Sequence, residues 1–248
     1  MESIKNRRTI RRYTTQDIPT DLLNSMLEEA ARASTMGGMQ LYSVIATRSK
    51  EVKEQLAPLH FNQPMVTSAP VVLTFCADFH RFSLWCEQNN ARPGYDNLLS
   101  FVNAATDALL LAQNFCTLAE AEGLGICYLG TTVYNPGGII DVLHLPPLVM
   151  PITTVTVGYP DEYPPQTDRL PLGGFLHEDT YQDYTIQDIG RIYAEKEALP
   201  ESRKFVEENH KANLAQVFTE VRYTQDTNLW ASANLKEALV RQGFLPAE

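Results

Sequence analysis

The sequence predicts an α+β fold, in which helices and strands alternate irregularly around a few central strands. Two runs without charged residues, at 71–77 and 152–158, have the length and the β-branched content of buried strands. A stretch at 96–122 is apolar on nearly every side, which predicts a helix buried in a large core or against another subunit. With 248 residues, 44% of them apolar, the chain is long enough for one large domain or two small ones.

Local signals predict the other elements in order. Apolar residues at helical spacing indicate a helix from Asp21 to about Ala33, which ends where Gly37 and Gly38 follow. The next expected elements are a strand at 41–47, a short helix at 50–57, a strand at 126–130 and a short helix at 135–143. Beyond residue 185 we expect two or three amphipathic helices. They have too few apolar residues to fold alone, so we interpret 185–248 as an arm of the same domain.

Positive charge is concentrated at the N-terminus of an acidic chain. Residues 1–13 carry five Lys or Arg and one Glu, whereas the whole chain has a net charge of −10. A guanidinium group pairs bidentately with phosphate, so this cluster suggests a phosphate anchor. The alternatives are a solvated basic tail and a nuclear-localisation signal. A sequence pI near 5.0 argues against nucleic acid as a partner, because duplex binding requires a broad basic face.

The cysteines and the apolar segments indicate the compartment. Cys76, Cys86, Cys116 and Cys127 form no CxxC pair and have no histidine at metal-ligand spacing, which predicts free thiols, a reduced compartment and no metal site. The N-terminus has no apolar run typical of a signal peptide. The most apolar stretch, 101–118, is interrupted by polar residues and is not expected to span a membrane. We therefore expect a cytoplasmic protein.

The chain lacks the motifs of several enzyme classes. It has no GxxxxGK[ST] loop, no GxGxxG after a strand, and no histidine in a nucleophile-elbow or metal pattern. An enzyme without such groups can still act when a bound cofactor supplies the reactivity.

Five motifs carry a resemblance to a known family, and they follow one another along the chain in the order in which that family has them. They are Arg7-Arg8-Thr9-Ile10-Arg11, the stretch 31–40, Gln63 with Phe75-Cys76-Ala77-Asp78, the stretch 122–130, and Arg169-Leu170-Pro171 followed by His177-Glu178 and Tyr181. This series resembles the FMN-dependent nitroreductase family, and within it the branch of oxygen-insensitive NADPH nitroreductases and flavin reductases. The resemblance covers residues 4–184 well and the remainder only loosely.

The resemblance implies a fold and an activity. The fold is the nitroreductase-like one, with a mixed or antiparallel central sheet flanked by helices. Residues 1–184 then form the FMN-binding domain, and 185–248 wrap around a second subunit in an intertwined homodimer. The activity is hydride transfer from NAD(P)H through FMN to a nitroaromatic, quinone or flavin acceptor, in ping-pong order. The chemistry takes place at flavin N5, so no protein residue is expected to be catalytic.

The resemblance also implies which residues hold FMN. Arg7 or Arg8, together with Arg169, surrounds the phosphate, and Thr9 donates a hydrogen bond to it. Arg11 is expected near N1 and O2 of the flavin, and Gln40 and Gln63 at the polar ring edge and the ribityl chain. Tyr128, Leu129 and Gly130 are expected beside the ring. The remaining expected FMN-binding residues are Thr35, Thr131 and Thr167.

Two positions depart from the family pattern. Thr167 stands where the branch commonly has lysine, which removes one cation from the phosphate site. Thr131 stands where the family has a second glycine, which adds a side chain near the flavin edge. These departures keep two alternatives open: a different reductase on the same scaffold, such as a dehalogenase or an enoate-type reductase, and a flavin- or nucleotide-binding protein with little turnover.

Overall fold

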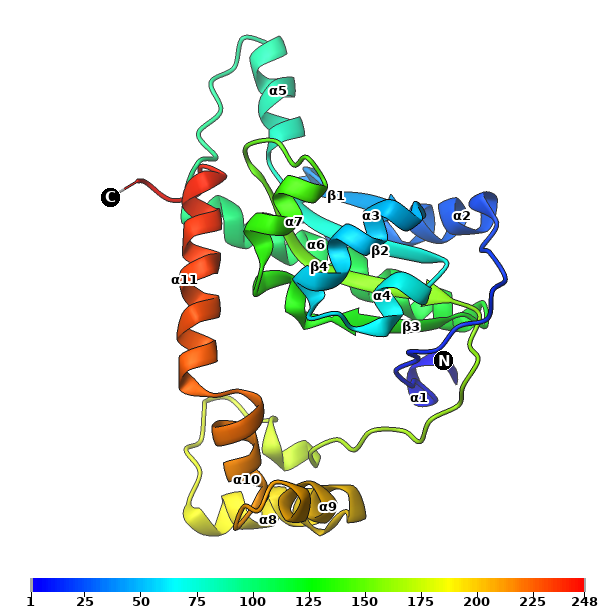
Figure 1. Cartoon of the computed structure of the whole chain (residues 1–248). Helices are drawn as coiled ribbons and strands as arrows, with labels where there is room; N and C mark the ends of the chain where they lie inside the picture. The colour runs from blue at the N-terminus through cyan, green and yellow to red at the C-terminus, as the bar shows by residue number, and fades with distance from the viewer. Residues whose placement is uncertain (1, 248) are drawn as a thin grey trace. The chain divides into compact units, whose positions relative to one another are not determined.

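The structure is a computed structural model that describes residues 2–247. It contains two compact units. The first unit comprises residues 2–166 and 231–247, and the second comprises Thr167–Trp230. Figure 1 shows the elements of both units.

The first unit is built on a four-stranded sheet with the order β1-β2-β4-β3, in which every neighbouring pair is antiparallel. Its strands are β1 (Tyr42–Thr47), β2 (Val71–Asp78), β3 (Gly125–Leu129) and β4 (Val149–Gly158). All residues of the two central strands, β2 and β4, are buried, as the β-branched runs within them predict. The α+β class and the central antiparallel sheet are therefore confirmed.

Helices cover both faces of this sheet (Figure 1). On one face, α2 (Thr20–Ala30) and α6 (Leu98–Ala121) pack against the strands, with the Phe75 and Phe115 ring centroids 6.0 Å apart. On the other face lie α3 (Lys50–Leu56), α4 (Pro64–Ser68) and α7 (Pro136–Val142). The sheet is thus the middle layer of three, which buries both of its faces.

Short elements connect these layers. They are α1 (Glu2–Lys5), the 3-10 turns η1 (Met36–Gly38), η2 (Ala57–His60) and η3 (Gly130–Val133), and the helix α5 (His80–Gln88). The C-terminal residues complete the first unit, because Ala238 and Phe244 pack with Phe79 and Met150 in a third apolar cluster.

The second unit is mostly helical. It contains η4 (Leu172–Gly174), α8 (Ile186–Ala198), α9 (Pro200–Glu208), α10 (Leu214–Val217), a π-helical turn η5 (Phe218–Arg222) and the first residues of α11 (Gln225–Arg241). A capping box starts α8: the Thr185 hydroxyl accepts from the Asp188 amide, and the Asp188 carboxylate accepts from the Thr185 amide.

The structure differs from the predicted elements in several places, among them α4, which was not predicted, and β4, which begins at Val149 rather than at 152. Helix α5 was not predicted, because its only buried residues are Ser83 and Cys86 and no apolar stripe marks it. The long helix begins at Leu98 rather than at 96, since the Asn97 side chain caps it by accepting from the Ser100 amide. The tail carries more helices than the two or three expected, in part because Pro200 begins a separate helix immediately after α8.

The second compact unit begins at Thr167, whereas the arm expected from the sequence begins at residue 185. Residues 167–184 group with the tail helices, because Lys196 pairs with Asp168 at 2.8 Å and Gly174 packs against Ile192. Residues 231–247 return to the first unit, where Gln242 donates to the Pro146 carbonyl at 2.8 Å.

Candidate functional site

The basic N-terminal segment lies along the edge of the sheet. Thr9 forms a parallel bridge with Ile126 of β3, and the Ile10 amide donates to the Ile126 carbonyl at 2.9 Å. The buried Tyr13 hydroxyl fixes the end of this segment, because it lies 2.8 Å from the Ile10 carbonyl and 2.7 Å from the Thr156 hydroxyl. The segment is therefore an ordered part of the fold and not a solvated tail.

Acidic residues engage two of the arginines in this segment. The Arg7 Nε lies 3.6 Å from the Glu120 carboxylate, at the end of α6. Arg12 pairs with Glu162 at 3.1 Å, and the same carboxylate accepts from the Arg11 and Arg12 amides. These hydrogen bonds lower the pKa of Glu162, and the one from the Arg11 amide has the largest effect. Glu162 thus fixes the backbone of the segment in place.

The other two arginines have no acidic partner among the described residues. Arg8 donates to the Asn6 carbonyl at a long 3.4 Å. The Arg11 guanidinium lies beside the Cys127 thiol, and its charge opposes the effect of burial, which raises the pKa of that thiol. The segment therefore presents cationic groups that remain available to an anion.

Two buried guanidinium nitrogens point to an anionic ligand. The Nε atoms of Arg7 and Arg8 are buried and have no hydrogen-bond partner among residues 2–247. Both arginines line a pocket of about 240 Å³, together with Glu120 and Gly125. Buried charged donors are normally paired. The Arg7 Nε faces Glu120 at 3.6 Å, whereas the Arg8 Nε faces no acidic group among the described residues, so Arg8 above all fits the oxygens of a phosphate group. The donors that this site offers are thus of the kind that FMN requires.

The end of β3 offers backbone to a ligand, not large side chains. Leu129 is only 2% exposed and faces the cluster beneath α3, α4 and α7, whereas Tyr128 packs on the opposite face. Gly130 is exposed, and a Cβ added to it would meet no atom within 4 Å. A flat ligand can therefore approach the main chain closely at Gly130.

Three polar side chains meet directly after Gly130. The Thr131 hydroxyl lies 2.8 Å from His60 Nδ1 and 3.5 Å from Gln63 Nε2. Gln63 and Thr131 are partly exposed, whereas His60 is completely buried. The structure thus brings together Thr131 and Gln63, two of the expected flavin residues.

A buried carboxylate holds the loop that carries Thr35 and Gln40. Asp107, in the middle of α6, is 2% exposed and accepts from the Met36 amide at 2.9 Å and from the Leu41 amide at 3.1 Å. Gln40 has a positive φ of 54°, and its carbonyl accepts from Arg81. Asp107 therefore determines the conformation of this loop.

The expected site residues of the first unit fall at two edges of one sheet. The loop with Thr35 and Gln40 precedes β1, at one edge, whereas Thr9 and Thr131 lie beside β3, at the other. The register places Gln40 and Thr131 toward the same end of the sheet, whereas Thr9, opposite Ile126, lies toward the other end. Three strand spacings, roughly 14 Å, separate β1 from β3.

Thr167 and Arg169 belong to the second unit. The Arg169 guanidinium donates to the Thr167 hydroxyl and the Asp168 carbonyl, at 2.8 Å and 2.7 Å. Both contacts are local, and Arg169 forms no ion pair with a described residue.

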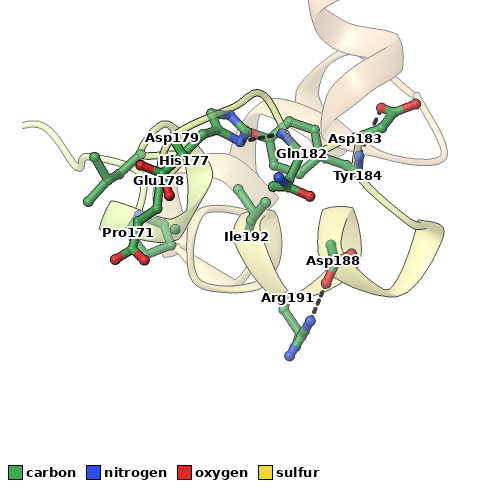
Figure 2. A pocket seen from close by; sticks show the side chains of 12 residues that line it. Pro171, His177, Glu178, Asp179, Gln182, Asp183, Tyr184, Asp188, Arg191 and Ile192 are labelled. Carbon is green, nitrogen blue, oxygen red and sulfur yellow. Dashed lines mark hydrogen bonds and ion pairs between the residues drawn. The ribbon is translucent and has the colours of Figure 1, made fainter.

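The second unit also holds a pocket of about 800 Å³ (Figure 2). None of the expected flavin residues lines it, and several of its polar groups contact one another. Arg191 pairs with Asp188, and His177 contacts both the Gln182 amide and the Tyr184 hydroxyl at 3.1 Å. These contacts give His177 and Tyr184 a structural role.

Sequence reasoning gave no role in the site to Asp107, Glu120 or His60. Asp107 has a visible signal, because it is a charged residue in the middle of a mainly apolar helix. Glu120 and His60 have no such signal, since their partners lie far away in the sequence.

The described residues contain no group of three His, Cys, Asp or Glu side chains that could hold a metal ion. Within the same part of the chain, no helix combines the length and the hydropathy needed to cross a membrane. All four cysteines are free and buried.

Comparison with known proteins gives a consistent result. Residues 4–159 match the model of the nitroreductase family. The FMN reductase (NADPH) of Bacillus subtilis (strain 168) is 34% identical over 183 residues, which make up 73% of this chain and 74% of that protein. The oxygen-insensitive NADPH nitroreductase of Salmonella typhimurium is 30% identical over 182 residues, or 73% of this chain and 74% of that protein.

A solved structure is similar over almost the whole length. This crystal structure, described as that of an oxidoreductase from Bacteroides fragilis NCTC 9343, is 65% identical, with a TM-score of 0.97. The similarity covers 99% of this chain and 100% of that one. On the evidence of the family match, the curated relatives and the antiparallel sheet with helices on both faces, the chain belongs to the nitroreductase family.

Proposed function

We propose that the protein is an FMN-dependent oxidoreductase that transfers a hydride from NAD(P)H, through FMN, to a nitroaromatic, quinone or flavin acceptor. Its relatives are named for FMN, for NADPH and for nitro reduction, which supports both the cofactor and the donor. One observation carries the proposal: a segment in which the buried Arg8 Nε has no partner among the described residues runs beside β3, which ends at an exposed Gly130 next to Thr131 and Gln63.

FMN, when bound, supplies a ring nitrogen that accepts a hydride and passes it on, so the protein needs no nucleophile of its own. Arg8 and Thr9 would hold the phosphate, with Arg7 and Arg169 contributing further positive charge. Arg11 would place a cation at the ring edge, where it stabilises the negative charge that builds up on reduction. Gln63 and Gln40 offer amide donors and acceptors for the polar ring edge and the ribityl chain.

We propose ping-pong order for the reaction, because one open face over Gly130 would serve the donor and the acceptor in turn. Gly130 lies where an added Cβ meets no atom, so a flat acceptor can stack there after the nicotinamide leaves. Parallel lines in double-reciprocal plots of NADPH against acceptor are expected; intersecting lines would contradict this order.

We further propose that the protein is an intertwined homodimer in which 185–248 wrap around the partner. Large apolar side chains on α6 remain exposed in a single chain, namely Leu98, Leu99, Val102, Leu109 and Leu110. The separation of Gln40 from Thr131 across the sheet fits a site that a second copy completes. Burying this face and the tail would form an interface larger than about 2,000 Å².

Sedimentation and truncation test the dimer. A stable monomer that still carries FMN at low protein concentration would refute the shared site. Deleting everything after Gln187 is expected to leave an insoluble or flavin-free protein, and a soluble, yellow truncation would show that the tail is dispensable.

We also propose a cytoplasmic location, for which the four free, buried cysteines are the support. A reducing compartment preserves such thiols, and cell fractionation tests the location.

The colour of the protein tests the function as a whole. The purified protein, or the protein loaded with FMN, is expected to be yellow and to bleach anaerobically on addition of NADPH or NADH. Bleaching that reverses when a nitroaromatic or a quinone is added supports the full reaction. A yellow protein that neither dinucleotide reduces would favour a binding protein, and a protein that cannot be loaded with FMN would contradict both functions.

A further inference from the structure

His60, Gln63 and Thr131 form a small polar cluster at the end of β3. His60 and Thr131 are 71 positions apart in the sequence, yet His60 Nδ1 lies 2.8 Å from Thr131 Oγ1. Gln63 Nε2 lies 3.5 Å from the same oxygen. Two nitrogen atoms from the η2–α4 segment therefore converge on one hydroxyl group.

Burial decides which nitrogen of His60 carries the proton. His60 is 0% exposed, and desolvation lowers its pKa to about 4, so the ring is neutral at pH 7. Its Nε2 is buried and has no hydrogen-bond partner among the described residues. A proton on Nε2 would be a buried donor without an acceptor, which proteins strongly avoid. The proton therefore resides on Nδ1, and His60 donates to the Thr131 hydroxyl oxygen.

This tautomer determines what the Thr131 hydroxyl can do. Its oxygen accepts from His60 Nδ1 and faces the Gln63 amide, so its own hydrogen must point away from both. No described residue accepts that hydrogen, and Thr131 is partly exposed beside Gly130. Thr131 thus presents a directed hydrogen-bond donor to the exposed end of β3.

We propose that His60 is a positioning residue, which orients the Thr131 hydroxyl to donate a hydrogen bond to a carbonyl oxygen on the imide edge of bound flavin. The inference rests on the proposed function. Because Gln63 turns its Nε2 toward Thr131, its Oε1 is left as an acceptor. The imide edge has a carbonyl beside an N–H, which one donor and one acceptor complement.

The tautomer is testable without any ligand. In ¹⁵N-histidine NMR of the protein free of FMN at neutral pH, His60 is expected to show a protonated Nδ1 and an unprotonated Nε2. Loss of its signals in His60→Asn assigns them among the five histidines. A protonated Nε2 would overturn the proposal.

Matched substitutions test the donor. Thr131→Ser keeps the hydroxyl and is expected to bind FMN within about twofold of wild type. Thr131→Val keeps the shape and removes the donor, so its Kd is expected to rise about five- to tenfold, as for one lost hydrogen bond. Its bound FMN is also expected to have a more negative midpoint potential, because a donor at a carbonyl draws electron density from the ring. Unchanged affinity and potential in Thr131→Val would overturn the proposal.

A double-mutant cycle tests whether His60 acts through Thr131. The Asn side-chain amide can replace Nδ1–H, so His60→Asn is expected to retain most of the affinity and potential, whereas His60→Gln is not. In the Thr131→Val background, His60→Gln is expected to have no further effect on the potential. Additive effects would make His60 merely structural and overturn its role. Wild-type protein that binds no FMN would instead refute the proposed function, whatever the tautomer.

Discussion

Ile10 lies directly against Gly125: a Cβ added to Gly125 would fall 2.6 Å from the Ile10 Cβ. Glycine at this position is what allows the N-terminal segment to lie alongside β3, where the Ile10 amide bonds to the Ile126 carbonyl. The contact therefore determines where Arg8, Thr9 and Arg11 are held.

Gly125→Ala is expected to displace this segment. Overpacking of this kind destabilises proteins by about 1–3 kcal/mol, and FMN affinity is expected to fall with it because the arginines move. Urea unfolding and FMN titration measure the two effects. Gly94→Ala is the control, since a Cβ there meets no atom within 4 Å. Equal stability of the two variants would mean that the segment adapts without strain.

Arg8→Ala is expected to weaken FMN binding more than Arg7→Ala. Glu120 already engages Arg7, whereas Arg8 has no acidic partner among the described residues. Loss of a charged hydrogen bond from Arg8 corresponds to about 1.5–3 kcal/mol, or roughly 10- to 150-fold in Kd. Fluorescence quenching of FMN measures both variants, and a larger loss in Arg7→Ala would reverse the assignment.

Arg169→Ala is expected to weaken FMN binding by about 2–3 kcal/mol, or roughly 30- to 150-fold, if the guanidinium pairs with the phosphate. Thr167→Lys is expected to tighten binding, because it adds a cation where the related branch has one. The same titration measures both. Wild-type affinity in Arg169→Ala would show that the phosphate binds elsewhere.

Asp107→Asn is expected to destabilise the protein by about 2–3 kcal/mol, because an amide nitrogen would then face one of the two backbone amides that the carboxylate now accepts from. Hydrogen exchange at 36–41 is expected to accelerate as the loop loosens. The exposed Asp96→Asn is the control for charge. Unchanged exchange in Asp107→Asn would contradict the role of this carboxylate.

Glu120 is expected to make stability depend on pH. Burial raises its pKa to about 7, against the opposing effect of Arg7. The native state therefore binds more protons than the unfolded state between about pH 4.5 and pH 7, so this contribution is present below that range and is lost as pH rises through it. Its size is on the order of 2 kcal/mol.

Glu120→Gln removes this titration. Relative to wild type, the variant is expected to lose less stability between about pH 5 and about pH 8 in urea unfolding. The exposed Glu122→Gln is the matched control. An identical pH dependence in wild type and Glu120→Gln would place the Glu120 pKa near its ordinary value.

Local sequence patterns were sufficient to predict most of the helices and strands. The β-branched runs of β2 and β4, which lack the polar–apolar alternation of a half-exposed strand, predict buried central strands, because only a sheet covered on both faces buries every side chain of a strand. Helix spacing predicts α2 and α6 to within a few residues. The series of five motifs indicates the family, which the match over residues 4–159 confirms.

Tertiary structure alone determined how the candidate site is assembled. Glu120 faces Arg7, Glu162 holds Arg11, Asp107 bonds the loop at Met36 and Leu41, and His60 contacts Thr131. Each of these pairs lies between 66 and 151 positions apart in the sequence. The sequence determines propensity and burial, which are local properties. The partner of a buried polar group depends on which distant segments the packed sheet brings within hydrogen-bond distance.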